Sequence, residues 1–586
     1  MELIEHYLKL QNHFSDVKIG TPIPISREEL ASLLFCSERN VVHIIQNLHE
    51  KKWIHWKSGR GRGNVSAITF MIHQADLIKM ESHSLIRKGS LSKLLYYIST
   101  YLLDQQKQEL LTQLPHLFGY NVIRDKEQTL DILTFPYFRH LFSLDPAYVE
   151  RQTERHMVSQ LFNTLVGYDA IQKKIEPKIA HYWQRNDNAT VWTFYLRKGI
   201  QFHHQQELTS DDVVFSFKRL IHTPSAWIIK GLQNVSPIDR YTVQFMFEHP
   251  NFVWLDLLTS PKASIVPNNL GDKSAKVFSR SPIGTGPYKI SEHTDQTFVL
   301  DSFHQHFQGR PHLDRIMVVF LPKAQEDVDT VSLKEKLVHY YPFLVNQQDG
   351  HDFNHVTRKH LSIKFLMWNM NRNVHSEQVR KVFSTSIHKL LLVDALRKNR
   401  QAPTDYFSKI EWQESNPIFH DIYNIHLTVM TYDLTPNIED LYWLRDNLKV
   451  SGIHLTIKIV SYSDFLNSEI NRGADLLYSE YVMEDNEVSS LINVYQSPFS
   501  MVVTSLDTQL RSKVEALIQA TKEENNTINQ RKGILTIEDL LLKNNILIPV
   551  YSTSQKAFFH KSLVGATLNN VGLVPFHDLF FLKDKE

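Results

Sequence analysis

The sequence predicts a multi-domain protein with a small α+β module at the N-terminus, a helical linker and a large α/β region. The chain has 586 residues, which is too long for a single hydrophobic core. Hydrophobic residues make up 42% of it and charged residues 22%, as is ordinary for globular domains. From about Thr129 onward, predicted strands alternate with predicted helices, which favours an α/β architecture with more than one lobe.

Two short helices are predicted near the N-terminus, over residues 26–34 and 38–51. Ser26 and Glu29 have the spacing of a capping box at the start of the first helix. Phe35-Cys36 interrupts the pattern, and Ser37 is a candidate N-cap for the second helix. Two helices joined by a tight turn of this kind are typical of a helix-turn-helix.

The second helix has one apolar and one polar side. The apolar residues Val41, Ile44, Ile45 and Leu48 recur at helical spacing and are expected to pack inward. The opposite side carries Arg39, His43, Gln46, Asn47 and Glu50, with Asn40 on its flank. Arg, Asn and Gln side chains can form hydrogen bonds with base edges in a major groove, so this side is a candidate DNA-reading surface.

A β-hairpin with a glycine- and arginine-rich turn is predicted after these helices. Strands are expected around Trp53–Trp56 and Ala67–Phe70, and between them Gly59, Gly61 and Gly63 alternate with Arg60 and Arg62. Arginines in such a wing can reach phosphates or the minor groove. From Cys36 to Asn64 the chain has six Lys and Arg against two Asp and Glu, although its formal net charge is only +1. The predicted DNA contacts are Ser37, Arg39, Asn40, His43, Gln46, Asn47, Lys57, Arg60, Arg62 and Asn64. A protein-docking role for the same module remains the alternative.

The expected boundaries are 1–74 for the winged helix-turn-helix, 75–126 for the helical linker and 127–586 for the α/β region. In the α/β region, strands are predicted over 132–138, 190–202, 361–370, 425–433 and 453–460, and helices over 148–165, 210–220, 375–396 and 437–447.

No catalytic or metal-binding motif stands out. The chain has 30 histidines, but pairs such as His203-His204 lack the accompanying ligands of a zinc site, and HExxH is absent. The segment from Gly284 to Tyr288 lacks the lysine of a phosphate-binding loop, and its Pro287-Tyr288 favours a rigid turn into a strand. We therefore expect a protein that is not an enzyme and that binds neither metal nor cofactor.

Several segments of the α/β region resemble the peptide- and nickel-type solute-binding proteins of family 5. They are LFNTLVGYD with IEPKIAHYW, TFYLRKGIQFHHQQELTSDDVVFSFKRL, SPIGTGPYKI, and FLMWNMNRNV with QVRKVFSTSI. The resemblance implies a two-lobed α/β fold of the type II periplasmic-binding-protein class, which closes on a ligand at a hinge. It places the first lobe at about 127–350 plus the C-terminal end, and the second at about 360–525.

The two modules together resemble the SgrR family of bacterial transcription regulators. The residues that carry this match are Trp53, Trp56, Gly61-Arg62-Gly63 and Thr69-Phe70, and then Ile179–Gln184, Phe202–His204 with Glu207-Leu208, and Ile283–Tyr288. The resemblance implies a transcription regulator whose second module senses a small ligand, with a sugar phosphate and a peptide-like metabolite as the classes considered.

The resemblance also suggests where a ligand would bind. In the peptide-binding relatives, an aspartate after a strand of the second lobe pairs with the peptide's ammonium group, and Glu484, with Asp485 beside it, falls closest to that place here. Trp368, Asn369 and Asn371, at the end of another predicted strand, are further candidates. A solvated acidic loop and ordinary core or turn residues are the alternatives at these positions.

The expected partners are promoter DNA, a small-molecule effector and a second copy of the chain, but not a membrane. The sequence starts MELIEHYLKLQNHF, which has no signal-peptide features, and Cys36 is its only cysteine. No stretch approaches the ~18 consecutive apolar residues of a transmembrane helix. We therefore expect a cytoplasmic protein. The alternative function is a transporter's solute-binding protein with an N-terminal docking domain; a hydrolase is more remote.

Overall fold

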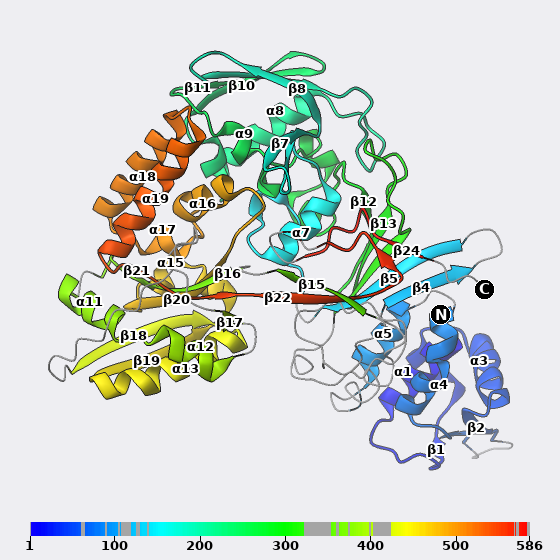
Figure 1. The fold of residues 1–586 in the computed structure, drawn as a ribbon. Coiled ribbons are helices and arrows are strands. Elements are labelled where there is room, and N and C mark those ends of the chain that lie inside the picture. The colour runs from blue at the N-terminus through cyan, green and yellow to red at the C-terminus, as the bar shows by residue number, and fades with distance from the viewer. Residues whose placement is uncertain are drawn as a thin grey trace. The chain divides into compact units, whose positions relative to one another are not determined.

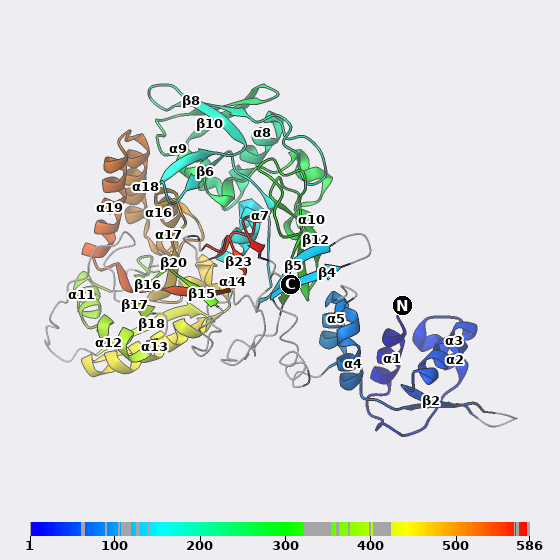
Figure 2. The ribbon, with the colours of Figure 1, turned by 45° about the vertical axis from the view of Figure 1, so that its right-hand side comes forward.

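The computed structural model describes most of the chain as two compact units. The described residues are 2–59, 65–87, 91–102, 106, 119–124, 129–137, 140–320, 353–358, 362–372, 375–397, 400–401, 424–567, 569 and 573–582. One unit is built mainly on Met1–His140, and the other mainly on Leu141–His293 together with described residues beyond Val299. The ribbons of Figure 1 and Figure 2 show the elements of each unit.

The N-terminal module is a winged helix. Its elements are α1 (Leu3–His13), β1 (Ile23–Pro24), α2 (Arg27–Leu34), α3 (Glu38–Glu50), β2 (Ile54–Lys57) and β3 (Ala67–Phe70). The strands form a three-stranded antiparallel sheet with β3 in the middle. The predicted capping box is present, since Glu29 N donates to Ser26 Oγ over 3.1 Å and Ser26 N donates to Glu29 Oε2 over 2.7 Å.

Helix α1 was not predicted, and it closes the module from the N-terminal side. Tyr7 is fully buried and makes edge-to-face contacts with the rings of Trp53 and Phe70. Gln11 Nε2 donates to Ile72 O over 3.0 Å, which ties the helix to the chain just after β3. The chain then continues through α4 (Gln74–Arg87) and α5 (Leu91–Tyr101) to the antiparallel pair β4 (Gly119–Arg124) and β5 (Thr129–Tyr137). Because β4 lies within 75–126, the segment predicted as a helical linker is not helical throughout.

One half of the second unit is built on a four-stranded antiparallel sheet. Its strand order is β10 (Leu232–Asp239), β11 (Thr242–Phe247), β9 (Val191–Leu196) and β8 (Ala180–Arg185). Before the sheet come η2 (Pro146–Tyr148), α7 (Gln152–Leu161) and the hairpin of β6 (Val166–Asp169) and β7 (Lys174–Pro177). Helix α8 (Ser210–Arg219) packs on β10 and β11. Along the chain follow α9 (Trp254–Leu257), η5 (Pro261–Ala263), α10 (Ala275–Arg280), β12 (Tyr288–His293) and β13 (Thr297–Ser302).

A six-stranded mixed sheet forms the other half of this unit. Its order is β17 (Arg400–Gln401), β21 (Leu547–Thr553), β16 (Ser362–Trp368), β20 (Leu476–Val482), β18 (Ile425–Tyr432) and β19 (Ile453–Val460). Strands β16 and β20 are antiparallel, whereas β18 and β19 are parallel. All seven residues of β16 are buried, as expected for a central strand covered on both faces.

Helices cover this sheet and join it to the rest of the unit. They are α11 (Glu377–Thr385), α12 (Lys389–Leu396), α13 (Thr435–Leu448), α14 (Tyr462–Phe465), α16 (Glu487–Gln496), α17 (Met501–Ser505), α18 (Thr508–Glu523) and α19 (Thr527–Lys543). In both ribbon views α18 and α19 lie side by side, while α12 and α13 cover the sheet near β18 (Figures 1 and 2). One hydrophobic cluster runs from the four-stranded sheet to the six-stranded sheet.

Most predicted elements occur, with three differences of extent. The strand predicted over 190–202 is shortened to β9, which ends at Leu196. The helix predicted over 148–165 is shortened to α7, because the chain from Phe162 is extended. The helix predicted over 375–396 is two helices, α11 and α12, separated at Ser386–His388. Among the described residues, we find no helix with the length and apolar character needed to cross a membrane.

Candidate functional site

The second helix of the winged helix, α3, has the two faces that its sequence predicts. Val41, Ile44, Ile45 and Leu48 are all at most 6% exposed and pack inward. The predicted DNA contacts on this helix and beside it are all exposed: Ser37, Arg39, Asn40, His43, Gln46, Asn47 and Lys57. Helix α3 therefore presents one contiguous polar face of hydrogen-bonding side chains.

The polar face is held in place by local contacts. Ser37 caps α3, because its Oγ accepts a hydrogen bond from Asn40 N at 3.4 Å. Gln46 Nε2 donates to Glu50 Oε1 over 3.1 Å along the helix. The side chains of Arg39, His43 and Asn47 are exposed on the same face. Arg60, Arg62 and Asn64, the predicted wing contacts, lie outside the described residues.

The turn between α2 and α3 exposes an aromatic side chain. Phe35 is 87% exposed, and its φ of 52° places it in the left-handed region that non-glycine residues rarely adopt. The left-handed cap lets Phe35 N and Cys36 N donate to carbonyls of the last turn of α2, which ends that helix sharply. This ending is what allows α3 to start at Glu38.

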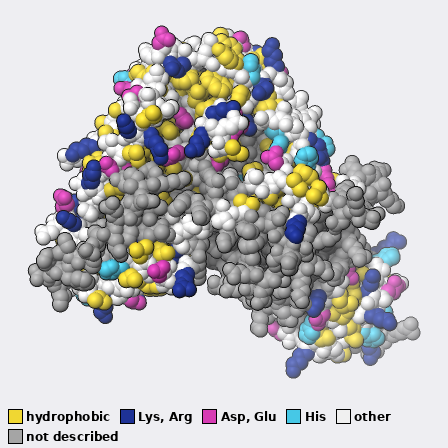
Figure 3. All heavy atoms as spheres, in the orientation of Figure 1, with side chains coloured by type: hydrophobic (Ala, Val, Ile, Leu, Met, Phe, Trp, Pro, Cys, Tyr) yellow, Lys and Arg dark blue, Asp and Glu magenta, His cyan; other side chains and the backbone are white. Residues whose placement is uncertain are grey.

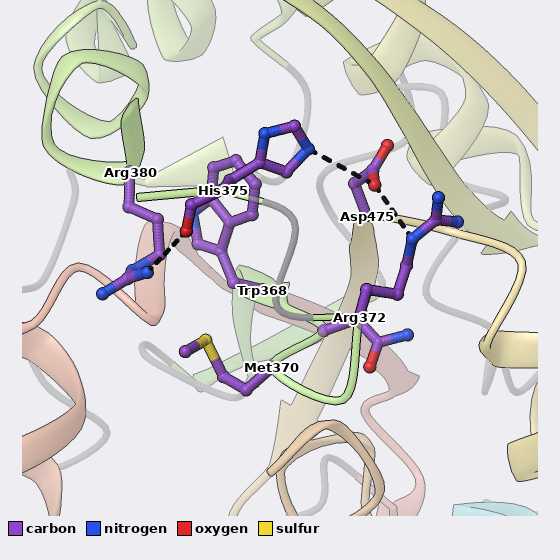
Figure 4. A pocket seen from close by; sticks show the side chains of 7 residues that line it. Trp368, Met370, Arg372, His375, Arg380 and Asp475 are labelled. Carbon is purple, nitrogen blue, oxygen red and sulfur yellow. Dashed lines mark hydrogen bonds and ion pairs between the residues drawn. The ribbon is translucent and has the colours of Figure 1, made fainter. Parts of the chain in front are cut away.

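In the second unit, two of the predicted ligand residues line a pocket at the end of β16. Its lining residues are Trp368, Asn369, Met370, Arg372, His375, Arg380 and Asp475 (Figure 4). Only about 10 Å³ of the pocket is open to the centre of a water molecule, which is room for roughly one water. Asn371 is not among the lining residues; its Nδ2 donates to Thr504 O over 2.8 Å.

The charged groups of this pocket are bound to one another or to the backbone. Asp475 Oδ1 lies 3.2 Å from Arg372 Nε and 3.4 Å from His375 Nε2, as the dashed lines of Figure 4 show. Asp475 Oδ2 accepts a hydrogen bond from Thr428 N at 2.8 Å. Arg380 extends on the other side of Trp368 and donates to His375 O and Asn544 O. These charged groups therefore already have partners within the chain.

Glu484, the predicted partner of a cationic ligand, forms an ion pair inside the chain. Its Oε1 accepts a hydrogen bond from Arg155 Nη1, and the two side chains are only 16% and 11% exposed. Burial by itself would lower the pKa of Arg155, but the carboxylate of Glu484 acts in the opposite direction and the pKa is raised. The guanidinium therefore stays charged beside Glu484. Asp485 is adjacent and partly exposed.

The predicted ligand residues fall in two separate places. Strand β16 pairs with β20 so that Trp368 is opposite Leu476 and Ser362 is opposite Val482. Glu484 follows Val482, so it lies at the other end of this strand pair from Trp368. Six residues of extended strand span roughly 20 Å. The structure therefore does not bring Glu484 and Asp485 together with Trp368, Asn369 and Asn371.

Sequence reasoning missed Arg155 and Asp475. Arg155 and Glu484 are 329 positions apart, so no local pattern could pair them. Asp475 is buried directly before β20, where a carboxylate is uncommon and needs partners, and this was the only available signal. No cluster of three or more His, Cys, Asp or Glu able to hold a metal occurs in the described part of the chain.

Two families of known proteins match parts of the chain. Residues 2–122 match the family described as "Sugar transport-related sRNA regulator N-term". Residues 174–436 match the family described as "Bacterial extracellular solute-binding proteins, family 5 Middle".

Curated relatives match this chain over different shares of their length. The HTH-type transcriptional regulator SgrR of Photorhabdus laumondii is 26% identical, with 85% of each chain covered. SgrR of Yersinia enterocolitica is 30% identical, with 56% of this chain and 55% of the relative covered. The protein YhjP of Bacillus subtilis is 26% identical, with 100% of both chains covered.

Solved structures with the fold of the second unit are solute-binding proteins. The oligopeptide-binding protein AppA of Bacillus subtilis, bound to a nonapeptide, has a TM-score of 0.62 and 17% identity, covering 77% of this chain and 99% of its own. The dipeptide-binding protein of Pseudoalteromonas sp. SM9913, bound to Met-Leu, has a TM-score of 0.65 and 14% identity, covering 77% of this chain and 100% of its own. These similarities confirm the predicted two-lobed type II fold.

Proposed function

We propose that the chain is an SgrR-like regulator with a family 5 solute-binding domain, and that it controls transcription by binding promoter DNA in response to a small molecule. The observation that carries the DNA-binding part is the exposed polar face of α3, which follows a sharply ended α2. A helix presented in this way can enter a major groove, with Arg39, Gln46 and Asn47 offered to base edges.

The charge of the wing and of the wider surface is a second argument for DNA binding by the N-terminal module. Lys57 is exposed at the end of β2, next to the glycine- and arginine-rich turn that would reach phosphates. On the visible face of the described residues, Lys and Arg are interspersed with Asp and Glu (Figure 3). Binding therefore depends on the local charge of the N-terminal module rather than on the net charge of +1.

The solute-binding domain is the proposed sensor. Its relatives of known structure hold a nonapeptide and Met-Leu, which supports a small molecule as the effector. A peptide-like metabolite and a sugar phosphate are the two classes we propose. In this proposal the protein acts in the cytoplasm, as a homodimer on DNA, and no catalytic step or cofactor is involved.

Gel-shift assays with DNA from upstream of the protein's own gene test this proposal. An Arg39→Ala/Gln46→Ala variant should bind more weakly by a factor of ten or more, since each base-reading contact is worth about 1–3 kcal/mol. An Arg60→Ala/Arg62→Ala variant should bind more weakly and with a shallower salt dependence. Lys174→Ala, which removes an exposed positive charge from the second unit, is the matched control and should bind like the wild type. Equal and salt-insensitive retention of all four proteins would refute DNA binding through this face.

A further inference from the structure

Helix α7 is fixed firmly at its N-terminal end. Glu150, just before the helix, accepts a hydrogen bond from Lys262 Nζ of η5 at 2.5 Å, and the Lys262 side chain is only 1% exposed. Within α7, His156 is also buried, with its ring edge-on to Phe576 at 4.9 Å. These contacts fix the first turn of α7, and long side chains on that turn can reach neighbouring elements.

Two arginines reach from here to the half of the unit that contains the six-stranded sheet: Arg151, just before α7, and Arg155, the fourth residue of the helix. The Arg151 guanidinium stacks over the Tyr462 ring of α14 at 4.6 Å. Arg155 pairs with Glu484, just after β20. Because the two arginines are four positions apart, they lie on one face of the helix start. Both contact the sheet half of the unit, and Arg151 also stacks over the Phe142 ring at 4.1 Å.

The Glu484 segment is itself held at two further points. Glu484 N donates to Ser490 Oγ over 2.7 Å, and Tyr481 OH donates to Ser490 O over 2.6 Å. Asn486 Nδ2 donates to Asp256 Oδ1 of α9 over 2.9 Å, a second polar link from this segment to the α7 half of the unit. The carboxylate of Glu484 is therefore presented to Arg155 by a braced loop, not by a free side chain.

We propose that Arg155 and Glu484 form a built-in clasp that holds the two halves of the solute-binding domain together without a ligand. Arg155 supplies, from within the chain, the cation that Glu484 would otherwise take from a ligand. A ligand with an ammonium group therefore cannot use Glu484 without displacing Arg155. The regulatory consequence, that the resting sensor is held closed by its own side chains, rests on the proposed function.

A distance measurement in the full-length protein tests the clasp directly. Ile171 of the β6–β7 turn and Val450 beside α13 are 95% and 82% exposed and can carry spin labels as Ile171→Cys and Val450→Cys, in a Cys36→Ser background. With the clasp intact, double electron–electron resonance should give one narrow distance distribution in the absence of added ligand. Glu484→Gln, which keeps the shape of the side chain, should shift the distribution to longer distances and broaden it. The doubly reversed variant Arg155→Glu/Glu484→Arg should restore the narrow distribution.

The controls separate loss of the clasp from loss of the fold and from failure of the proposed function. Lys543→Met breaks an exposed ion pair with Asp539 within α19 and should leave the distribution unchanged. Circular dichroism identifies any variant that fails to fold, and Glu484→Gln and the reversed pair each report independently. Distributions for Glu484→Gln and wild type that coincide, or a reversed pair as broad as Glu484→Gln, would overturn the clasp. A wild type that does not bind DNA would contradict the proposed function and leave the distance result standing.

Discussion

A fully buried ion pair joins α13 to the six-stranded sheet. Arg400 and Asp440 both have side chains with no exposed surface, and Arg400 Nη2 lies 2.8 Å from Asp440 Oδ1. Tyr478 OH and Tyr551 OH donate to Asp440 Oδ2 over 2.7 and 2.6 Å. The sequence offers no sign of this network, because its members lie on β17, α13, β20 and β21 and meet only after the sheet has formed.

Removing the charge of Asp440 should destabilise the second unit strongly. In Asp440→Asn the guanidinium of Arg400 keeps only Glu439 as a charged partner, and loss of one member of a buried pair costs about 3–5 kcal/mol. Asp446→Asn is the matched control, since Asp446 pairs with Arg445 on the exposed side of the same helix. Urea unfolding followed by circular dichroism should separate the two variants clearly. Equal stability of both would contradict a structural role for the network.

Buried histidines should make the stability depend on pH. Burial lowers the pKa of His156 and of His203 to about 3 each, whereas an unfolded histidine titrates near 6.5. Between these two values the unfolded chain binds protons that the folded chain does not, so stability falls as the pH drops below about 6.5. Each histidine should contribute about 1.4 kcal/mol per pH unit within that window.

The free energy of unfolding, measured in urea at pH 7.5 and pH 5.5, reports this effect. The wild type should be less stable at pH 5.5, and His156→Phe should show a smaller difference between the two pH values. The variants are compared by the change in the free energy of unfolding between the two pH values. A cost of packing the phenylalanine ring is the same at both pH values and therefore cancels. An unchanged difference in His156→Phe would show that His156 is protonated in the folded protein.

At the scale of single elements, the sequence predicts where the chain turns but not always why. The turn at Pro287-Tyr288 leads into β12 as expected. The structure shows why this turn contains glycines: it packs closely on the end of α7, where Gly286 N donates to Leu161 O over 2.9 Å. A Cβ on Gly284 would lie 2.0 Å from Leu161 O, so a side chain cannot fit there.

Gly284→Ala should therefore push the turn away from α7. Forcing a methyl group into such a contact typically costs about 1–3 kcal/mol, which should appear as a lower melting temperature. Gly473→Ala is the control, because its nearest neighbour would lie at 3.4 Å. Equal melting temperatures for the two variants would mean that the turn does not pack on α7 as described.

Helix α3 shows how far a local pattern reaches. Its caps and apolar spacing predicted both its N-cap at Ser37 and its buried face, because these depend on residues within one or two turns. The single helix predicted over 375–396 was wrong because the local pattern there does not show where the chain leaves the helix. Its apolar spacing continues across Ser386–His388, where the chain nevertheless leaves the helix between α11 and α12.

For the whole molecule, the N-terminal module could be derived from residue patterns, whereas the two-lobed fold came from resemblance. Long-range contacts decide the rest. Strand pairing places Trp368 and Glu484 at opposite ends of β16 and β20, and no sequence pattern indicates that separation. The domain boundaries at 74/75 and 126/127 remain predictions, as do the homodimer and the cytoplasmic location.

The claim that the N-terminal module recognises a specific DNA sequence is tested most directly by footprinting on the protein's own upstream region, with a salt titration of the affinity. We predict a protected site that is lost in Arg39→Ala/Gln46→Ala, together with an affinity that falls steeply as salt rises. Binding of equal strength to the upstream region and to a scrambled fragment, unaffected by the double substitution, would contradict it.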